Sequence, residues 1–194
     1  MTAASLEPGY FDRLYADRAD PWGFTTSAYE HAKYAATLAA LPDARFACAV
    51  EVGCSIGVLT RRLAGRCDAL LGLDVADAAL AAAAARCVDV PWVTFARSTL
   101  PTTPPPGAFD LIVLSEVLYY FDADGVVAMV AAARAMAAPA ATLMLVHWLG
   151  PTPDYPLTGE AAVAAFLAPA PWATIVHQAR TPQYRIDVLR APDG

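Results

Sequence analysis

The chain has 194 residues, of which 57% are hydrophobic, and it carries a formal net charge of −6. This length predicts a single domain over residues 1–194, with a sizeable core and no room for a second domain. Only 13 residues are Lys or Arg, and no basic run is interleaved with aromatic residues. We therefore expect a small or neutral substrate and no nucleic acid partner.

Two further classes of protein are disfavoured by the sequence. Residues 1–10 lack the basic and apolar regions of a secretory leader, and no apolar stretch approaches the roughly 18 residues of a membrane span. We therefore expect a cytoplasmic protein that does not contact a membrane. The cysteines form no C-x-x-C pair and have no His at metal-ligand spacing, so we expect reduced packing residues and no metal site. They are Cys48, Cys54, Cys67 and Cys87.

The first part of the chain, residues 10–26, is interpreted as an aromatic-rich loop. Ser27 with Glu30 three positions later forms a capping-box pattern, which predicts a helix that continues until Pro42 stops it.

Two interpretations of this region stay open. The helix can simply dock against the core, or Trp22, Tyr29 and Lys33 can form a lid over a bound ligand. In the second interpretation Lys33 is a candidate to bind a carboxylate of that ligand.

The central pattern of the sequence is the run 49–59, Ala-Val-Glu-Val-Gly-Cys-Ser-Ile-Gly-Val-Leu. An apolar strand turns through Gly53 and Gly57 into a helical pattern, an arrangement that places a small polar ligand beside a helix N-terminus. A dinucleotide fingerprint begun at Gly53 would need glycines where Ser55 and Val58 stand. NAD and FAD are therefore disfavoured.

Counted from Glu51, the same run matches E-x-G-x-G-x-G except at Ser55. The next predicted strand, 70–74, ends in Asp74, and an acid at this place can bridge ribose hydroxyls.

This segment resembles the class I S-adenosylmethionine-dependent methyltransferases, which implies S-adenosyl-L-methionine as the cofactor. By that resemblance Glu51 belongs to the cofactor site, Gly53 and Gly57 border the methionine part, Ser55 replaces a small turn residue there, and Asp74 holds the ribose.

The residues 53–57 also read Gly-Cys-Ser-Ile-Gly, the G-x-S-x-G pattern of a nucleophile elbow. A serine hydrolase would use Ser55 as the nucleophile, with Asp122 or Asp154 and then His177 in the required chain order. No run that would form an oxyanion hole precedes the turn, so this alternative is disfavoured. A non-catalytic nucleotide-binding module is a third possibility, which would bind the cofactor without turning it over.

The residues 92–95 predict a third strand, and Ser98 follows it. The methyltransferase resemblance implies an acid near the adenine at this place, and that acid is missing here. Ser98 or the backbone is left to supply the adenine contact.

The continuous apolar run 109–116 predicts a central parallel strand buried on both faces. Ligands bind at the carboxyl ends of such strands, so we expect Ser115, Glu116, Tyr119 and Tyr120 beside the turn after the first strand.

A helix is predicted over 124–138, with Pro139 stopping it, followed by a strand over 142–146 that leads into His147. A histidine at a strand end that faces the binding crevice is a candidate proton acceptor. The proline-stiffened loop 150–158 follows, with Asp154 and Tyr155 as candidates to lie over the site.

At the end of the chain, Thr158 is expected to cap a helix, and the runs 173–178 and 184–189 predict an antiparallel pair. The whole pattern predicts an α/β fold: a doubly wound, mostly parallel, seven-stranded sheet with a terminal antiparallel hairpin. The methyltransferase resemblance implies the strand order 3-2-1-4-5-7-6. Residues 1–42 then form the N-terminal lid and helix, and residues 43–194 form a Rossmann-like core.

Within this superfamily, five segments resemble the nodulation protein S family of N-methyltransferases. They are residues 20–22, 29–34, 51–57, 115–120 and 154–159. The resemblance implies transfer of a methyl group to the free amine of an amino sugar, such as a deacetylated chitooligosaccharide, or to another small-molecule acceptor. Among the residues near the predicted strand ends, Glu116 and Tyr119 are expected to orient the amine and neutral His147 to accept its proton. Water could equally take that proton before binding. The oligomeric state is left open.

Overall fold

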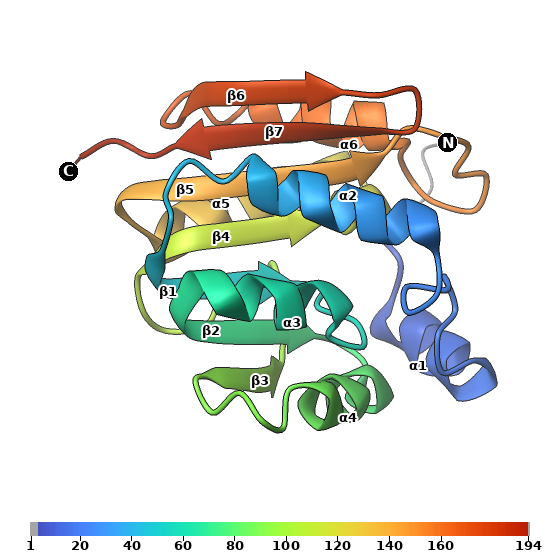
Figure 1. Cartoon of the computed structure of the whole chain (residues 1–194). Coiled ribbons are helices and arrows are strands. Elements are labelled where there is room, and N and C mark those ends of the chain that lie inside the picture. The colour runs from blue at the N-terminus through green and yellow to red at the C-terminus, as the bar shows by residue number, and fades with distance from the viewer. Residues whose placement is uncertain (1–3, 194) are drawn as a thin grey trace. The chain divides into compact units, whose positions relative to one another are not determined.

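The computed structural model describes residues 4–193. Residues 1–3 and Gly194 lie outside the described residues, so the expectation about a leader in residues 1–10 falls partly outside them. The contacts divide the chain into two compact units. We call residues 7–98 the N-terminal unit, and residues 99–193 with residues 4–6 the C-terminal unit. Residues 4–193 contain seven strands and have an α/β architecture (Figure 1).

The N-terminal unit contains three parallel strands in the order β3-β2-β1. Its elements in chain order are α1 (Pro8–Asp17), α2 (Ala28–Ala39), β1 (Phe46–Val52), α3 (Val58–Leu63), the 3-10 turn η1 (Ala64–Arg66), β2 (Cys67–Asp74), α4 (Asp77–Arg86) and β3 (Val93–Arg97). Val52 pairs with Leu73, and Asp74 pairs with Arg97. The carboxyl ends of the three strands therefore lie at one edge of this half of the sheet.

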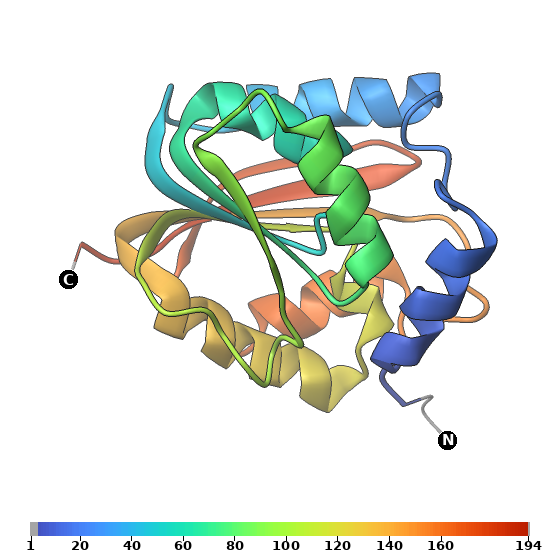
Figure 2. The same cartoon turned by 90° about the horizontal axis from the view of Figure 1, so that it is seen from below.

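The C-terminal unit contains four strands in the order β4-β5-β7-β6. Its elements in chain order are β4 (Phe109–Ser115), the 3-10 turn η2 (Leu118–Tyr120), α5 (Ala123–Met136), β5 (Ala137–Trp148), α6 (Gly159–Leu167), β6 (Thr174–Arg180) and β7 (Tyr184–Arg190). The β4–β5 pair is parallel, and β7 is antiparallel to both β5 and β6. Figure 2 shows α5 and α6 side by side along one face of these strands. The predicted terminal hairpin is confirmed, and the strand order within each unit agrees with the expected one.

Burial explains why these strands form the cores of the two units. In the N-terminal unit, Leu70 and Leu73 of β2 are almost fully enclosed. In the C-terminal unit, Leu111, Ile112 and Leu114 of β4 are fully enclosed on both faces of the strand, as the continuous apolar run predicted.

Two local predictions about helix ends are confirmed. The side chain of Ser27 accepts the N–H of Glu30 at 3.2 Å, and that of Thr158 caps α6. The structure adds a third cap, because the side chain of Asp122 accepts the N–H of Gly125 at 2.8 Å at the start of α5.

Two predictions about element bounds are wrong. Residues 10–26 do not form only a loop, because α1 occupies Pro8–Asp17. Pro8 stands at the first turn of α1, where its missing N–H costs nothing, and this was a usable signal for a helix start. Helix α5 ends at Met136, before Pro139, which lies inside β5. Here the strand begins earlier than the apolar run indicated.

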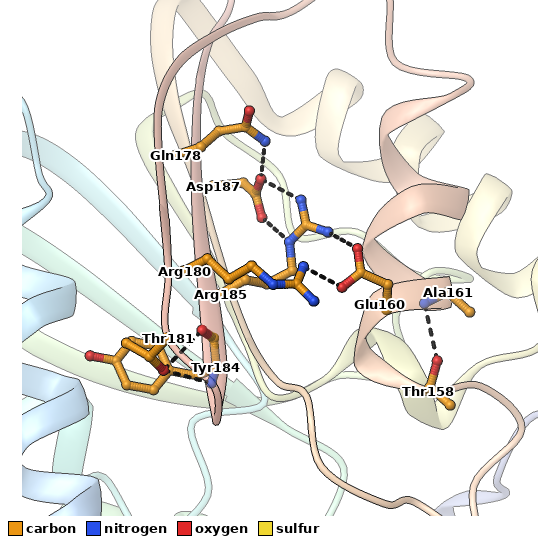
Figure 3. A network of polar contacts seen from close by, with 9 residues as sticks. All are labelled: Thr158, Glu160, Ala161, Gln178, Arg180, Thr181, Tyr184, Arg185 and Asp187. Atoms are coloured by element: carbon orange, nitrogen blue, oxygen red, sulfur yellow. Dashed lines mark hydrogen bonds and ion pairs between the residues drawn. The ribbon is translucent and has the colours of Figure 1, made fainter.

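Polar contacts join the β6–β7 hairpin to α6 within the C-terminal unit (Figure 3). Asp187, which is 1% exposed, accepts two hydrogen bonds of 2.7 Å from Arg185 and one of 2.5 Å from Gln178. Arg185 and Arg180 also pair with Glu160 in the first turn of α6. The hairpin and the start of α6 are thereby fixed to each other.

None of the helices within residues 4–193 combines the length and the apolar character that crossing a membrane requires. In the same residues, no group of three His, Cys, Asp or Glu side chains is arranged to hold a metal ion.

Candidate active site

The turn between β1 and α3 has the backbone shape that the glycine pattern predicted. Gly53, Ser55 and Gly57 have φ angles of 72°, 51° and 77°, which place all three in the left-handed region. Position 57 also has no room for a side chain, because a Cβ there would lie 2.9 Å from the Cα and Cβ of Ala83 in α4. The predicted turn is therefore confirmed by its backbone angles, and it joins the predicted strand, β1, to the predicted helix, α3.

Asp74, at the end of β2, holds this turn. Its Oδ2 accepts the backbone N–H of Ser55 at 2.8 Å, and its Oδ1 accepts that of Ala76 at 3.0 Å. Burial raises the pKa of the Asp74 carboxyl, and the hydrogen bonds from these amides oppose that shift. The structure thus brings Asp74 to the glycine turn, as the sequence indicated.

Ser98 lies beside the same acid. It follows the last residue of β3, and its backbone N–H donates to the carbonyl of Asp74 at 3.0 Å. Ser98 is therefore at the strand edge where the sequence analysis expected it, and its contact with adenine stays a prediction.

Glu51 is enclosed beneath the turn, with 2% of its surface exposed. The pKa of its carboxyl is raised to about 8, mainly by burial; the Thr60 hydroxyl opposes this shift and the negative charge of Asp74 adds to it. Glu51 is consequently mostly protonated at neutral pH. Its enclosed position suits a role in supporting the turn, and direct contact with a cofactor stays a prediction.

Ser55 has a partner that the sequence analysis missed. Its hydroxyl and that of Tyr15, on α1, share a hydrogen bond of 2.5 Å. Burial raises the pKa of the Tyr15 phenol, with Asp74 adding to the shift, so Tyr15 is neutral and is no base for a nucleophilic serine. The i, i+3, i+4 spacing of Phe11, Leu14 and Tyr15 after Pro8 was the signal that could have revealed α1.

Trp22 belongs to a chain of aromatic rings in the N-terminal unit. Its ring centroid lies 5.9 Å from that of Tyr15 and 5.4 Å from that of Phe24, and Phe24 contacts Tyr34 of α2 at 6.5 Å. Asp20 fixes the loop by accepting the backbone N–H groups of Phe24 and Thr25. The predicted lid residue Trp22 therefore connects α1 with α2.

Lys33 is buried on α2, with 2% of its surface exposed, and donates to Glu30 at 3.1 Å. Its Nζ also lies 5.1 Å from the ring centroid of Tyr29, the third predicted lid residue. Binding of a cofactor carboxylate by Lys33 stays a prediction, and it would require Lys33 to share or exchange its bond to Glu30.

In the C-terminal unit, Glu116 follows β4, whose last residue Ser115 pairs with Val146 of β5. Its backbone has a φ of 56°, an uncommon value for a residue other than glycine. The Glu116 Oε2 accepts the hydroxyl of Tyr119 at 2.9 Å and the backbone N–H of Trp148 at 2.8 Å. The carboxylate is thus held in a fixed orientation by two donors.

His147, the last of the predicted catalytic set, lies close to the other two. Its ring contacts that of Tyr119 edge-on at 5.7 Å. The His147 side chain is fully enclosed, and its Nε2 accepts the backbone N–H of Leu118 at 3.2 Å. The neutral ring therefore carries its proton on Nδ1. An acceptor amine could deliver a proton to Nε2 only by displacing the Leu118 N–H, so this geometry favours a supporting role for His147.

Tyr155, from the loop 150–158, covers η2. Its ring stacks on that of Tyr119 at 5.3 Å and contacts that of Tyr120 edge-on at 4.8 Å. Burial raises the pKa of both Tyr119 and Tyr120 well above the usual range, so these phenols stay neutral donors. The loop 150–158, which is expected to carry site residues, is therefore packed onto Tyr119, the residue that donates to Glu116.

Comparison with known protein families identifies this arrangement. The family model for nodulation protein S (NodS) matches residues 12–145. The chain belongs to the nodulation protein S family. The family predicted from the five sequence segments is therefore confirmed.

Two curated relatives show the extent of the similarity. Nodulation protein S of Bradyrhizobium diazoefficiens is 40% identical over 132 residues, which are 64% of this chain and 61% of that protein. The counterpart of Sinorhizobium fredii is 32% identical over 104 residues, or 53% of this chain and 48% of the relative. The alignments thus span less than two thirds of the length of these NodS relatives.

Solved structures show the same fold. The N-methyltransferase NodS from Bradyrhizobium japonicum WM9, in complex with S-adenosyl-L-homocysteine, has a TM-score of 0.83 at 22% identity and covers 95% of this chain and 97% of its own. A candidate methyltransferase from Pseudomonas syringae is 34% identical, with a TM-score of 0.75 and coverage of 84% and 99%. The chain therefore has the Rossmann-like class I methyltransferase fold, and the predicted fold class is confirmed.

Proposed function

We propose that this chain is an S-adenosylmethionine-dependent methyltransferase that methylates an amine nitrogen on an amino sugar or a chitooligosaccharide-like acceptor. The observation that carries the proposal is the placement of Asp74 on a left-handed glycine turn in a member of the nodulation protein S family. The solved NodS relative, which contains the demethylated cofactor, supports the assignment.

The residues around the turn fit S-adenosylmethionine. Asp74 accepts the Ser55 N–H through Oδ2 and the Ala76 N–H through Oδ1, and each carboxylate oxygen has a second lone pair with which to accept a ribose hydroxyl. Gly53 and Gly57, which carry no side chain, would border the methionine part of the cofactor, and Ser98, whose N–H donates to the Asp74 carbonyl, would be available to the adenine. When bound, the cofactor supplies a sulfonium methyl group that is already reactive.

The C-terminal unit supplies the groups that orient an acceptor. The Glu116 carboxylate is fixed by Tyr119 and Trp148. It accepts an N–H of the acceptor amine in a charge-assisted hydrogen bond, and this bond orients the lone pair of the amine nitrogen. Ser115 precedes it at the end of β4. His147 holds Leu118, and with it η2, in place. Because the His147 Nε2 is occupied, the acceptor ammonium loses its proton to water before attack.

We also propose that the protein acts on small molecules in the cytoplasm, without a nucleic acid or membrane partner. The net charge of −6 supports the absence of a nucleic acid partner, since a polyanion would be repelled. Cys48, Cys54, Cys67 and Cys87 form no disulfide within residues 4–193, which fits a reducing compartment.

A comparison of acceptors tests the proposal. Purified protein is incubated with S-adenosylmethionine that carries a labelled methyl group, and parallel reactions contain glucosamine oligomers, small amines or hydroxyl acceptors. Label on the amino sugars is the expected result, and label on small amines alone would replace the acceptor class. Calorimetry with S-adenosylhomocysteine is the companion measurement, and a failure to bind would contradict the cofactor assignment.

A further inference from the structure

Ser55 occupies the glycine turn with a backbone shape that a serine does not adopt readily. Ser55 lies between Gly53 and Gly57 and has a φ of 51°. It stands at the one glycine position of E-x-G-x-G-x-G where this chain has a side chain. A residue with a Cβ adopts this conformation only where its surroundings hold it there. The contacts of Ser55 therefore decide whether the turn keeps its shape.

Two contacts hold Ser55, and they come from different elements. Its backbone N–H donates to the Oδ2 of Asp74 at 2.8 Å, from the end of β2. Its hydroxyl shares a 2.5 Å hydrogen bond with that of Tyr15, from α1. Ser55 thus joins α1 to the acid that is assigned to the ribose.

Tyr15 is placed firmly enough to act on Ser55. Its side chain is buried, with 7% exposed, and its ring packs edge-on against Trp22. Helix α1 itself packs against α4, the helix whose Ala83 touches Gly57 (Figures 1 and 2). The hydroxyl therefore reaches the turn from a packed scaffold in the same unit.

We infer that Tyr15 is a positioning residue of the cofactor site, which acts through Ser55 to keep the turn and Asp74 in the geometry that binds the nucleoside. The inference rests on the proposed function and extends it to α1. Binding of the cofactor and the Tyr15–Ser55 bond then stabilise one another, because a ligand that needs the ordered Asp74 also favours every contact that orders it.

Calorimetric titration with S-adenosylhomocysteine tests this role in a set of variants. Tyr15→Phe keeps the packed ring and removes the hydroxyl, and Ser55→Ala removes the same bond from the other side. Each is expected to weaken binding about three- to tenfold, the range of one lost hydrogen bond, and the double variant is expected to be no weaker than either one.

Ser55→Gly provides the decisive background. Glycine adopts the left-handed shape without support, so this variant is expected to bind more tightly than Ser55→Ala, which keeps a Cβ and also lacks the hydroxyl. Adding Tyr15→Phe to Ser55→Gly is then expected to leave the affinity unchanged. Tyr10→Phe makes the same chemical change on the same helix and serves as the control.

Amide hydrogen exchange measured by NMR gives a readout apart from ligand affinity. In Tyr15→Phe the Ser55 amide should exchange faster, whereas the Ser98 amide, which is bonded to the Asp74 carbonyl, should not. A Tyr15→Phe chain with unchanged affinity, or one equally impaired in the Ser55→Gly background, overturns the inference alone. An original chain that does not bind S-adenosylhomocysteine contradicts the proposed function itself.

Discussion

The backbone N–H of Trp148 donates a 2.8 Å hydrogen bond to the carboxylate of Glu116, which joins the end of β5 to the residue after β4. The same oxygen accepts the Tyr119 hydroxyl. A carboxylate with two donors on one oxygen is oriented before any substrate arrives, and such preorganisation is what alignment of a nucleophile requires.

Substitution of Glu116→Gln tests this orienting role. The amide keeps the shape and one acceptor oxygen but loses the charge, so we expect kcat/KM for an amine acceptor to fall about 10- to 100-fold. Affinity for S-adenosylhomocysteine should not change. Steady-state kinetics and calorimetry measure the two effects, with the exposed Asp124→Asn as the control. Equal activity in the Glu116→Gln chain would remove Glu116 from the acceptor site.

Loss of the Asp74 carboxylate is expected to affect the cofactor directly. Asp74→Ala removes the acceptor for the ribose and for the Ser55 amide, so binding of S-adenosylhomocysteine should weaken by roughly 1 to 3 kcal/mol. Asp77→Ala is the matched control, because this exposed acid lies three residues later and forms a surface ion pair with Arg97. Calorimetric titration of both variants distinguishes them, and equal affinities would contradict the assignment.

Glu51 predicts a dependence of stability on pH. In the folded chain burial raises the pKa of its carboxyl from 4.5 to about 8. Between these values the folded state holds a proton that the unfolded state has lost, so this group makes stability fall as pH rises through that window. Glu51→Gln removes the effect, and its stability relative to the original chain should increase by up to about 1.4 kcal/mol per pH unit.

Urea unfolding of both chains at several pH values between 5 and 8 measures this difference. The two chains should have similar stability near the acidic end and diverge toward pH 8. A gap that stays constant across the series would show that Glu51 does not carry a raised pKa.

The Arg185–Asp187 pair predicts a contrast between two arginines. Arg185→Ala leaves the enclosed Asp187 charge without its bidentate partner and should lower the free energy of unfolding by about 3 kcal/mol or more. Arg180→Ala breaks only a solvent-exposed pair with Glu160, which is worth less than about 1 kcal/mol. Thermal and urea unfolding compare the two, and equal losses would contradict the account of this network.

The sequence predicted the parts of the structure that depend on local pattern. The glycine turn followed from the spacing of Gly53 and Gly57, because left-handed backbone and close packing on Ala83 both demand glycine there. The position of Asp74 beside this turn followed because neighbouring parallel strands end at the same edge of a sheet. The capping residues Ser27 and Thr158 followed from the short reach of their side chains.

The contacts that could not be predicted depend on distant residues. Nothing around His147 in the sequence shows that the Leu118 amide occupies its Nε2. The Tyr15–Ser55 bond joins residues 40 positions apart, and it was further hidden because α1 was interpreted as part of a loop. Residue type alone also misplaces one helix start: Asp is a favoured N-cap, yet α4 begins at Asp77 itself and Ala76 is the N-cap.

Transfer of a methyl group from S-adenosylmethionine to nitrogen is the reaction that defines the proposed activity. The most direct test is to incubate the protein with methyl-labelled cofactor and glucosamine oligomers and to locate the label by tandem mass spectrometry. We predict the label on the amino nitrogen, with transfer reduced in the Asp74→Ala chain. Label found only on hydroxyl oxygen, or no transfer to any amine by a protein that binds S-adenosylhomocysteine, would contradict the account.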